Sequence, residues 1–454
     1  MQTRRDFLKT TAAVTAGFLG LRYWASGNVL ADPAAGFGAL VPDKGGILDL
    51  PAGFSCKVIS RRGETMADGL LVPGAPDGMA AFAGADGKTV LIRNHELDFN
   101  SVANGAFGAK YALLEKADIA KLYDAGKKTT PGLGGTSTLI FDTKTGTLEK
   151  QFMSLAGTSR NCAGGPTPWG SWVTCEETVT LAAGTIEKDH GYNFEVPSTA
   201  TGLVEAVPLK QMGRMNHEAI AVDPKSGIVY ETEDRPDGLI YRYIPNQKEK
   251  LAAGGKLQVL KVRDKTSLDT RNWKEATVKV GESLSVEWLD IDEVEAPKDD
   301  LRLRGFTKGA ARFARGEGMW YGRDAIYFAC TNGGSEKLGQ IWRYTPSPVE
   351  GQADESKQPG KLELFVEPND GNLVENADNL TVAPWGDLIV CEDGPGGNGL
   401  VGVTSKGQVY RFAHNAQSKS ELAGVTFSPD GTTLFVNLQG DGMTLAITGP
   451  WPKA

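Results

Sequence analysis

The 454-residue sequence is poor in cysteine and histidine, with five cysteines and four histidines. No apolar run reaches the roughly 20 residues needed to span a bilayer. Five cysteines are too few for a disulfide framework, and one stays unpaired if the others pair. Positive charge is not in excess either, because 48 basic side chains face 56 acidic ones. This balance argues against a nucleic-acid partner and fits cation binding. We expect a monomer with no integral membrane span.

A catalytic serine is also missing from the motifs. No Gly-x-Ser-x-Gly elbow is present that would place a serine nucleophile at a strand-to-helix turn. Four histidines leave few candidates for a titrating general base. No motif therefore indicates a serine nucleophile, and few histidines are available as a titrating base.

What the sequence does contain is a recurring hairpin-like unit, with an apolar run, a turn rich in Gly, Pro and Asp, and a second apolar run. Gly, Pro and Asp supply the backbone angles that a chain reversal needs. The returning runs are β-branched and aromatic, as strands require. They are Val90–Ile92, Ile228–Tyr230, Ile326–Phe328, Leu388–Val390 and Leu434–Val436.

The spacing inside these units predicts the fold. Pairs 13 residues apart join the start of a first strand to the end of its partner: Ala81 with Asn94, Cys162 with Cys175, Glu218 with Glu231, Glu317 with Cys330, Asp378 with Cys391, and Gly424 with Asn437. Six copies with irregular spacers predict an all-β fold, a six-bladed β-propeller. An irregular β-sandwich with chance spacing is the alternative.

Two stretches depart from this pattern. Residues 100–130 are predicted to form a helical insertion, and residues 246–312 a charge-rich mixed insertion. Insertions of this kind usually lie on a propeller's rim, where they can cover a central site.

The predicted closure has a chemical consequence at one end of the channel. The starts of the first strands and the ends of their partners carry many carboxylates, which would repel one another unless cations neutralise them. Carboxylates and amides suit Ca²⁺, whereas a thiolate suits iron or zinc. Cys162, beside Gly164 and Gly165, is the best thiolate candidate; the cysteines at 175, 330 and 391 are expected to be buried small hydrophobes.

The histidines remain open between two roles. His95 and His217 both occur as Asn-His-Glu, so each could bind phosphate or a metal-bound water. Strand alternation instead points each away from its neighbouring glutamate, towards a supporting or packing role. His190 and His414 belong to no motif and are expected at the surface or in turns.

The N-terminus has the three parts of an export signal. Arg4 and Arg5 precede a weakly apolar stretch, and a small-residue cleavage site ends at Ala31. We predict a twin-arginine signal peptide over 1–31, recognised by the twin-arginine translocase, and a single domain over 32–454 in the periplasm or secreted.

The segment from Asn161 to Glu177, Asn-Cys-Ala-Gly-Gly-Pro-Thr-Pro-Trp-Gly-Ser-Trp-Val-Thr-Cys-Glu-Glu, resembles the signature of the PhoX-type alkaline phosphatases. Asn94–Glu96, Gly213–Glu218 and Asp378–Leu380 fit the same family in the same order. The resemblance spans most of the chain after the signal. It implies a six-bladed propeller that hydrolyses phosphomonoesters with two iron ions, up to three calcium ions and a bridging oxide.

The resemblance also implies site residues. Arg315 is the residue that would contact phosphate. The implied metal ligands are, for iron, Cys162, Glu218 and Glu317, with Glu96 and Glu177 as further carboxylates, and, for calcium, Glu233, Asp378, Asn379, Glu392 and Asp393.

Two other functions fit parts of the sequence. A calcium-dependent lactonase or phytase-like propeller would use the same carboxylates, but it has no use for a thiolate at Cys162. A non-enzymatic periplasmic binding propeller would not need converging carboxylates.

Overall fold

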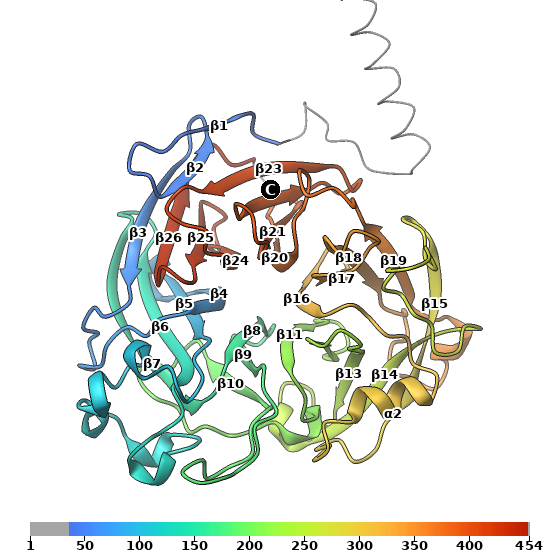
Figure 1. Cartoon of the computed structure of the whole chain (residues 1–454), viewed down its shortest axis with the longest axis horizontal. Coiled ribbons are helices and arrows are strands. Elements are labelled where there is room, and N and C mark those ends of the chain that lie inside the picture. The colour runs from blue at the N-terminus through green and yellow to red at the C-terminus, as the bar shows by residue number, and fades with distance from the viewer. Residues whose placement is uncertain (1–35, 453–454) are drawn as a thin grey trace, which may run out of the picture.

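The structure is a computed structural model that describes residues 36–452. Within this range the chain forms five antiparallel sheets arranged around a central axis (Figure 1). The fold is therefore all-β with a propeller-like arrangement. The predicted signal of residues 1–31 lies outside the described residues.

The first two sheets contain the strands of residues 76–197. One sheet has four strands in chain order, β4 (Pro76–Ala83), β5 (Thr89–His95), β6 (Gly134–Asp142) and β7 (Thr147–Thr158). The next has three strands in the order β10, β9, β8, with bounds β8 (Asn161–Pro166), β9 (Ser171–Glu176) and β10 (Asn193–Pro197).

A nine-stranded sheet follows, in which two four-stranded runs share one outer strand. The first run is β11 (His217–Val222), β12 (Val229–Glu233), β13 (Ile240–Pro245) and β14 (Gly255–Val262). The second run is β16 (Gly316–Gly322), β17 (Ala325–Cys330), β18 (Gln340–Thr345) and β19 (Lys361–Val366). Between β14 and β19 lies β15 (Ser283–Asp290), which pairs with both.

The last two sheets combine the two ends of the described chain. One has β20 (Ala377–Val382), β21 (Leu388–Glu392), β22 (Gly399–Val403) and β23 (Val409–Asn415), extended by β2 (Leu48–Pro51) and β1 (Leu40–Val41). The other has β24 (Leu422–Phe427), β25 (Thr433–Leu438) and β26 (Met443–Thr448), closed by β3 (Ser55–Arg61). Residues from before β4 thus complete sheets formed by the C-terminal strands.

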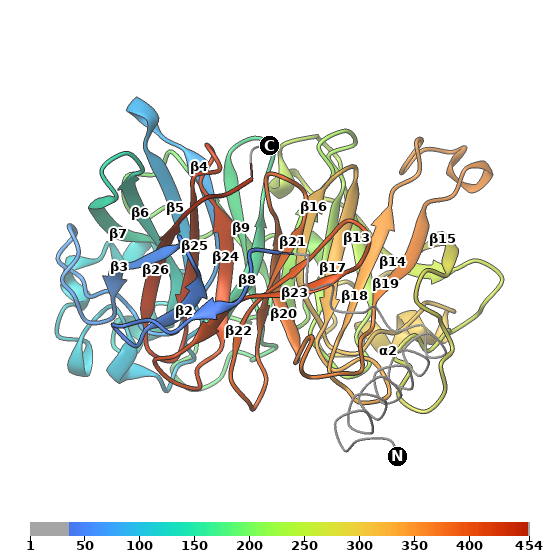
Figure 2. The ribbon, with the colours of Figure 1, turned by 90° about the horizontal axis from the view of Figure 1, so that it is seen from above.

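Six strands line the centre, and we call them the inner strands: β4, β8, β11, β16, β20 and β24. Each contacts the next, and β24 contacts β4, so the ring is closed. The strands run between the two faces of the disc, as the view from above shows (Figure 2). Apolar side chains fill the spaces between neighbouring sheets; Trp172, for example, is 1% exposed and donates its indole N–H to Asn94 Oδ1 at 2.8 Å.

Glycines let the inner strands approach closely just inside the ring. A Cβ at Gly318 would lie 2.6 Å from the Cα of Asn379, and one at Gly78 would lie 2.6 Å from the Cα of Ala163. Real Cβ atoms do not tolerate such contacts, so these positions need glycine. The centre of the ring is consequently packed by backbone.

The two predicted insertions differ in structure. Segment 100–130 contains five short 3₁₀ helices outside β7 rather than one α-helix (Figure 1): Val102–Asn104, Ala109–Tyr111, Leu114–Lys116, Ile119–Lys121 and Gly126–Lys128. Segment 246–312 contains the 3₁₀ helix Leu251–Ala253, β14, β15 and the α-helix α2 (Leu301–Thr307), which lies outside the ring. No helix within residues 36–452 is long and apolar enough to cross a membrane.

Candidate metal centre

A register shift at the start of each inner strand determines which side chains gather at the site. In β8, for example, Asn161 pairs with Glu176 and the next pairing is Gly164 with Thr174, so two residues face one. The same shift occurs in the other five inner strands. A β-bulge of this kind re-aims the bulged side chain, and such bulges are common beside active sites. The first bulged residues, here called the ring positions, are Asp77, Cys162, Glu218, Glu317, Asp378 and Gly424.

Five of these six positions were predicted from the 13-residue spacing, and one prediction was wrong. Ala81 was expected at the start of the first unit, but the bulge lies at Asp77. The reason is that β4 and β5 are longer than the other hairpins, since β4 has 8 residues and β8 has 6. A fixed spacing therefore places the start four residues too late.

A second set of side chains comes from the residues that directly follow the strand paired with each inner strand. In five units the backbone N–H of this residue donates to a carbonyl just before the inner strand, as Glu96 does to Ala75 O at 2.9 Å and Glu177 does to Arg160 O at 2.8 Å. We call these the second positions: Glu96, Glu177, Asp234, Thr331 and Asp393.

Strand alternation sends the preceding residues to the opposite side. Glu233 accepts from the Tyr241 hydroxyl at 2.7 Å, and Glu392 accepts from the backbone of Glu375 and pairs with Arg411. Glu233 and Glu392 therefore face away from the site, and Asp234 and Asp393 occupy the second positions of their units. The hairpin of Glu233 is one residue longer than that of Cys162, which the constant spacing did not anticipate.

The two Asn-His-Glu histidines follow the same alternation. His95 is buried and its ring contacts Gly74 O at 3.0 Å and Ser137 Oγ at 2.8 Å. His217 is buried between Gly213 O at 3.0 Å and the Glu231 carboxylate at 3.1 Å. Both therefore brace the sheets behind the site rather than face it.

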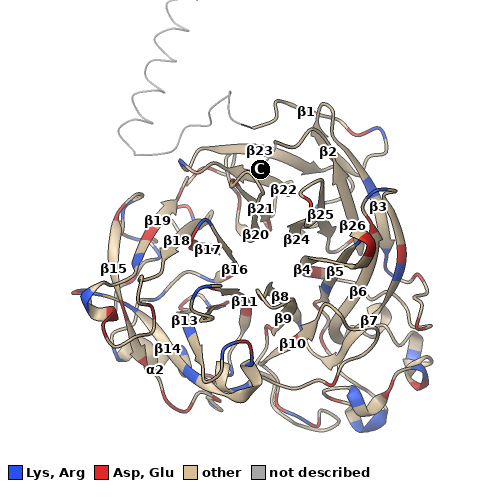
Figure 3. Cartoon of the chain, turned by 180° about the vertical axis from the view of Figure 1, so that it is seen from behind, with Lys and Arg blue, Asp and Glu red and all other residues tan. Residues whose placement is uncertain are grey.

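Three groups of potential ligands are brought together, each with atoms within 4.8 Å of one another. They are Asp77 with Glu96 and Cys162, Cys162 with Glu177 and Glu218, and Glu218 with Glu317 and Asp378. Because Cys162 and Glu218 are shared, the groups form one continuous cluster. Figure 3 shows acidic positions on the inner strands β4 and β11, within this region. Of the ten predicted ligands, six belong to these groups.

The other predicted ligands lie around the cluster. Asn379 donates to Asp378 Oδ1 at 3.1 Å and accepts from Gly424 N at 2.7 Å, so it links β20 to β24. Asp393 lies close enough for its charge to raise the pKa of Asp378. Gln439, which was not predicted, donates to Asp77 at 2.8 Å and to Glu96 at 3.1 Å.

The cluster carries more negative charge than the protein neutralises. Burial and the neighbouring carboxylates Asp378, Glu177 and Asp77 hold the pKa of Glu218 well above its usual value. Burial and neighbouring acids also raise the pKa of Glu177 to about 8 and of Asp378 to about 7. Both oxygens of Glu218 and Oδ1 of Asp77 are buried without a hydrogen-bond partner. Buried carboxylates without partners are costly, and a cation is the simplest remedy.

The thiol adds a soft donor to this oxygen-rich set. Cys162 Sγ lies 3.7 Å from Asp77 Oδ2. Burial and the charges of Asp77 and Glu218 raise the pKa of the thiol well above its usual value, so it stays protonated unless a cation binds. All five cysteines are free, and those at 175, 330 and 391 are buried as expected. A thiolate with carboxylates fits a transition metal, and the remaining carboxylates fit Ca²⁺.

Two arginines border the cluster from the more exposed side. Arg315 forms a bidentate pair with Asp234, with Nε to Oδ1 at 2.8 Å and Nη2 to Oδ2 at 2.6 Å, and also approaches Glu317 at 3.1 Å. Arg160 pairs with Glu96 at 2.7 Å and with Glu177. Their side chains are 37% and 41% exposed, whereas the Glu317 side chain is 6% exposed.

Backbone strain also concentrates at this end. Ala75, Arg160, Arg315 and Asn376 have positive φ angles of 41°, 51°, 53° and 54°, and each stands two residues before a ring position. A left-handed conformation costs a non-glycine residue about 1 kcal/mol or more. Residues held in this way cluster at functional sites, where they fix the direction of nearby side chains.

Sequence reasoning missed Asp77, Asp234, Arg160 and Glu421, and it misplaced His190. Burial and the charges of Asp378 and Asp393 raise the pKa of Glu421 well above its usual value, which places it beside the cluster. An alignment of the units by bulge rather than by fixed spacing would have found Asp77 and Asp234. His190 was expected at the surface or in a turn, but it is fully buried. There it lies between two carboxylates that are themselves fully buried.

Comparison with known proteins gives a family and a fold. The sequence model of the family described as "Alkaline phosphatase PhoX" matches residues 35–140 and 125–442. No curated protein matches the sequence. The fold is similar to that of Pseudomonas fluorescens PhoX, which was solved in complex with vanadate, a transition state analogue. The two chains are 16% identical, the match covers 93% of this chain and 97% of that one, and the TM-score is 0.66. A Xanthomonas campestris gluconolactonase, 14% identical over 92% of this chain and 99% of that one, has a TM-score of 0.40, too low to carry an argument.

Proposed function

The chain belongs to the PhoX family of alkaline phosphatases, and from this premise we propose that it hydrolyses phosphomonoesters at a metal centre held by its ring and second positions. The observation that carries the proposal is Glu218, which is buried in the middle of the cluster with both carboxylate oxygens lacking a partner. Its neighbours in the cluster are Cys162, Glu177, Glu317 and Asp378.

We further propose that the fold is a six-bladed propeller. The closed ring of six inner strands supports this count. The nine-stranded sheet then represents two blades, β11–β14 and β16–β19, joined at their outer edges by β15. On this interpretation each blade contributes one ring position to the site, and the domain extends over residues 32–454.

The proposed cofactor contains two iron ions, up to three calcium ions and a bridging oxide, as the family resemblance implies. Cys162, Glu218 and Glu317 are the proposed iron ligands, with Glu96 and Glu177 close by. Asp378 and Asp393 are the proposed calcium ligands best supported by position, and Asp77 joins them as a candidate. When bound, such ions neutralise the phosphoryl oxygens and supply an activated oxygen nucleophile.

The chain's own residues would bind and orient the substrate. Arg315 would hold the phosphoryl oxygens, for which the planar guanidinium is well suited. Its bidentate pair with Asp234 fixes the plane of the guanidinium before substrate arrives. The close backbone approaches at Gly78 and Gly318 narrow the centre of the ring behind the site, so substrate would enter from the side of the more exposed arginines.

Export through the twin-arginine route would deliver the folded chain to the periplasm or the medium. The proposal rests on Arg4 and Arg5 and on the cleavage site at Ala31. It fits a protein whose metal centre is built from side chains of five different inner strands, because such a centre exists only after folding.

Elemental analysis of the protein purified from the periplasm, together with turnover of p-nitrophenyl phosphate, tests the proposal. We expect iron and calcium in the preparation and phosphate release that stops when the metals are removed by chelator. Calcium alone with hydrolysis of lactones would instead support a lactonase-like enzyme. A stable, metal-free and inactive preparation would support a binding propeller and contradict the proposed function.

A further inference from the structure

Arg160 and Arg315 occupy equivalent positions in two different units. Each stands two residues before its ring position and has a left-handed backbone. The N–H of Arg160 donates to Leu97 O and that of Arg315 to Arg235 O, both at 3.0 Å, and these acceptors directly follow second positions of the preceding unit. The carbonyls of the two arginines accept from the second positions of their own units, at 2.8 and 3.0 Å.

The side chains repeat the same arrangement. Each guanidinium forms an ion pair with the acidic second position of the preceding unit, Arg160 with Glu96 and Arg315 with Asp234. The equivalent positions in the other units with this backbone bond are Ala75, Asn216 and Asn376, none of which carries charge. Of these five equivalent positions, two therefore carry a positive side chain beside the cluster, Arg160 and Arg315.

Both arginines border the same central acid. Arg160 pairs with Glu177, which lies in one ligand group with Glu218, and Arg315 approaches Glu317, which lies in another ligand group with Glu218. Each guanidinium therefore contacts a carboxylate that shares a ligand group with Glu218, and the two arginines do so through different groups. Both are considerably more exposed than the acids they contact, so they line the approach to the cluster.

We propose that Arg160 is a second substrate-binding arginine, which contacts phosphoryl oxygens of the ester from the side opposite Arg315. This inference rests on the proposed phosphatase function. Cations bound to Glu96 and Glu177 would compete with Arg160 for the same carboxylate oxygens. The Arg160 guanidinium would then be free to donate to the oxygens of an anion held by those cations. A phosphomonoester dianion has enough oxygen acceptors to engage two guanidinium groups as well as cations.

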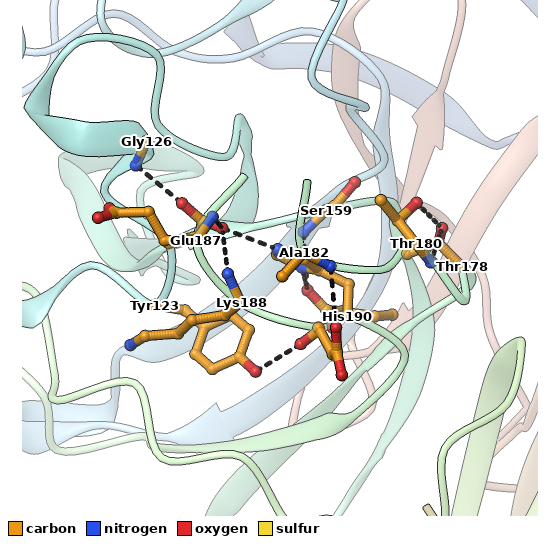
Figure 4. Close-up of polar contacts among 12 residues, drawn as sticks. Tyr123, Gly126, Ser159, Thr178, Thr180, Ala182, Glu187, Lys188 and His190 are labelled. Atoms are coloured by element: carbon orange, nitrogen blue, oxygen red, sulfur yellow. Dashed lines mark hydrogen bonds and ion pairs between the residues drawn. The ribbon is translucent and has the colours of Figure 1, made fainter. Parts of the chain in front are cut away.

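A buried charged bridge supports Arg160 but not Arg315. His190 lies between Glu176, at 2.6 Å from Nδ1, and Asp124, at 3.5 Å from Nε2, with all three side chains fully buried. Glu176 also accepts from the backbone N–H of Ser159 at 2.9 Å (Figure 4). Ser159 and Glu176 directly precede Arg160 and Glu177 in the chain, so the bridge fixes the backbone on both sides of this ion pair.

The same bridge connects the site to segment 100–130. Asp124 accepts from the backbone N–H groups of Gly126, Glu187 and Lys188 at 2.7–3.0 Å, and so joins this segment to the loop that carries His190 (Figure 4). At Arg315 the residues equivalent to Ser159 and Glu176 are Ala314 and Cys330, which cannot form such a bridge. His190 is thus a positioning residue for Arg160.

The test compares Arg160→Gln with the matched variant Arg315→Gln in the metal-loaded protein from the periplasm. Inorganic phosphate binding is measured by titration calorimetry, alongside metal content and the KM and kcat for p-nitrophenyl phosphate. We expect each variant to weaken phosphate binding by about tenfold to a hundredfold and to keep its metals, because each removes a charge-assisted contact. Arg160→Lys should recover part of the loss.

The inference is overturned if Arg160→Gln binds phosphate as tightly as the wild type, or if it loses metal while the loaded fraction binds phosphate normally. If the wild type turns over ester and Arg160→Gln does so equally well, the role of Arg160 is rejected but the phosphatase function stands. Wild-type protein that neither binds phosphate nor turns over ester would reject the proposed function as well. His190→Gln should weaken phosphate binding less than Arg160→Gln; a larger loss than in Arg160→Gln would contradict a role that acts through Arg160.

Discussion

Two charged clusters in this molecule differ in how far the chain itself provides partners for their carboxylates. Around Arg242, which is 2% exposed, the carboxylates of Glu350 and Glu355 lie at 2.6 and 2.8 Å from its two terminal nitrogens. Glu350 also accepts from the hydroxyls of Tyr230 and Tyr344 at 3.0 and 2.8 Å. At the metal centre, by contrast, Glu218 has no partner for either oxygen.

The difference separates a structural cluster from a functional one. Burying charge costs several kcal/mol per ion unless partners compensate it. The Arg242 cluster is compensated within the chain, so it needs nothing from outside. The central cluster has several acids for two arginines, so bound protons or bound cations must balance it, and at neutral pH and above cations are needed. Buried charge alone does not identify a site, but buried charge without a counter-charge does.

The largest expected effect follows from Glu218→Gln. The substitution removes the central ligand, so we expect metal loss and at least about a thousandfold lower phosphatase activity, since the metals supply most of the catalysis. The same change should leave the melting temperature of the chelator-treated protein unchanged or higher, because it removes a buried charge. Elemental analysis, turnover and thermal unfolding check this. A chelated variant that melts well below the chelated wild type would show that Glu218 is compensated after all.

Arg242→Met provides the matched change in the Arg242 cluster. It leaves Glu350 and Glu355 without their cation, and breaking such a buried pair costs about 3–5 kcal/mol. We expect denaturant unfolding to show this loss while metal content and kcat per folded molecule stay at wild-type values. Reduced metal content in folded protein would mean that the two clusters are coupled and that the contrast between them is wrong.

Cys162→Ser tests the soft donor of the central cluster. A hydroxyl has nearly the size of the thiol but binds iron poorly, so we expect bound iron and activity to fall together, by about tenfold or more. Calcium content and the circular dichroism spectrum should change little. Iron that remains at the wild-type level would remove Cys162 from the metal centre.

The pH dependence of the chelated protein gives the smallest effect. The pKa values of Glu177 and Asp378 are raised to about 8 and about 7 in the folded chain, so the folded state keeps protons that the unfolded state has lost. The contribution of these two groups to stability is therefore full below about pH 4, falls by about 2 kcal/mol or more as the pH rises towards 8, and then levels off. Unfolding in urea at a series of pH values measures this. The metal-loaded protein should not show the decline, and a chelated protein that gains stability between pH 4 and 8 would contradict the excess of buried acid.

The sequence was sufficient for the all-β fold, the hairpin units and most of the cluster. Turn residues and β-branched runs are local signals, so the two strands of each hairpin unit, such as β11 with β12 and β16 with β17, could be located from them. Cys162, Glu218, Glu317 and Asp378 could be found because their hairpins have nearly equal length. The family resemblance, which the family comparison confirms, rested on the same segments.

What could not be predicted depends on hairpin length and on distant contacts. One extra residue in the hairpin of β11 and β12 moves the site-facing acid from Glu233 to Asp234, and a longer first hairpin moves the ring position from Ala81 to Asp77. Burial of His190 depends on Asp124, 66 residues away. Neither a single strand nor its composition contains that information.

The pairing of β3 with β26 has a consequence for the order in which the cluster forms. Asp77, at the start of β4, meets Gln439 and Gly424 only when the last sheet is in place beside the first. A nascent chain that still lacks residues 422–448 has therefore not yet assembled one side of the cluster. The complete cluster therefore forms only after β24–β26 have folded beside β4, and a chain truncated before β24 should lack the contacts that Gln439 and Gly424 make with Asp77.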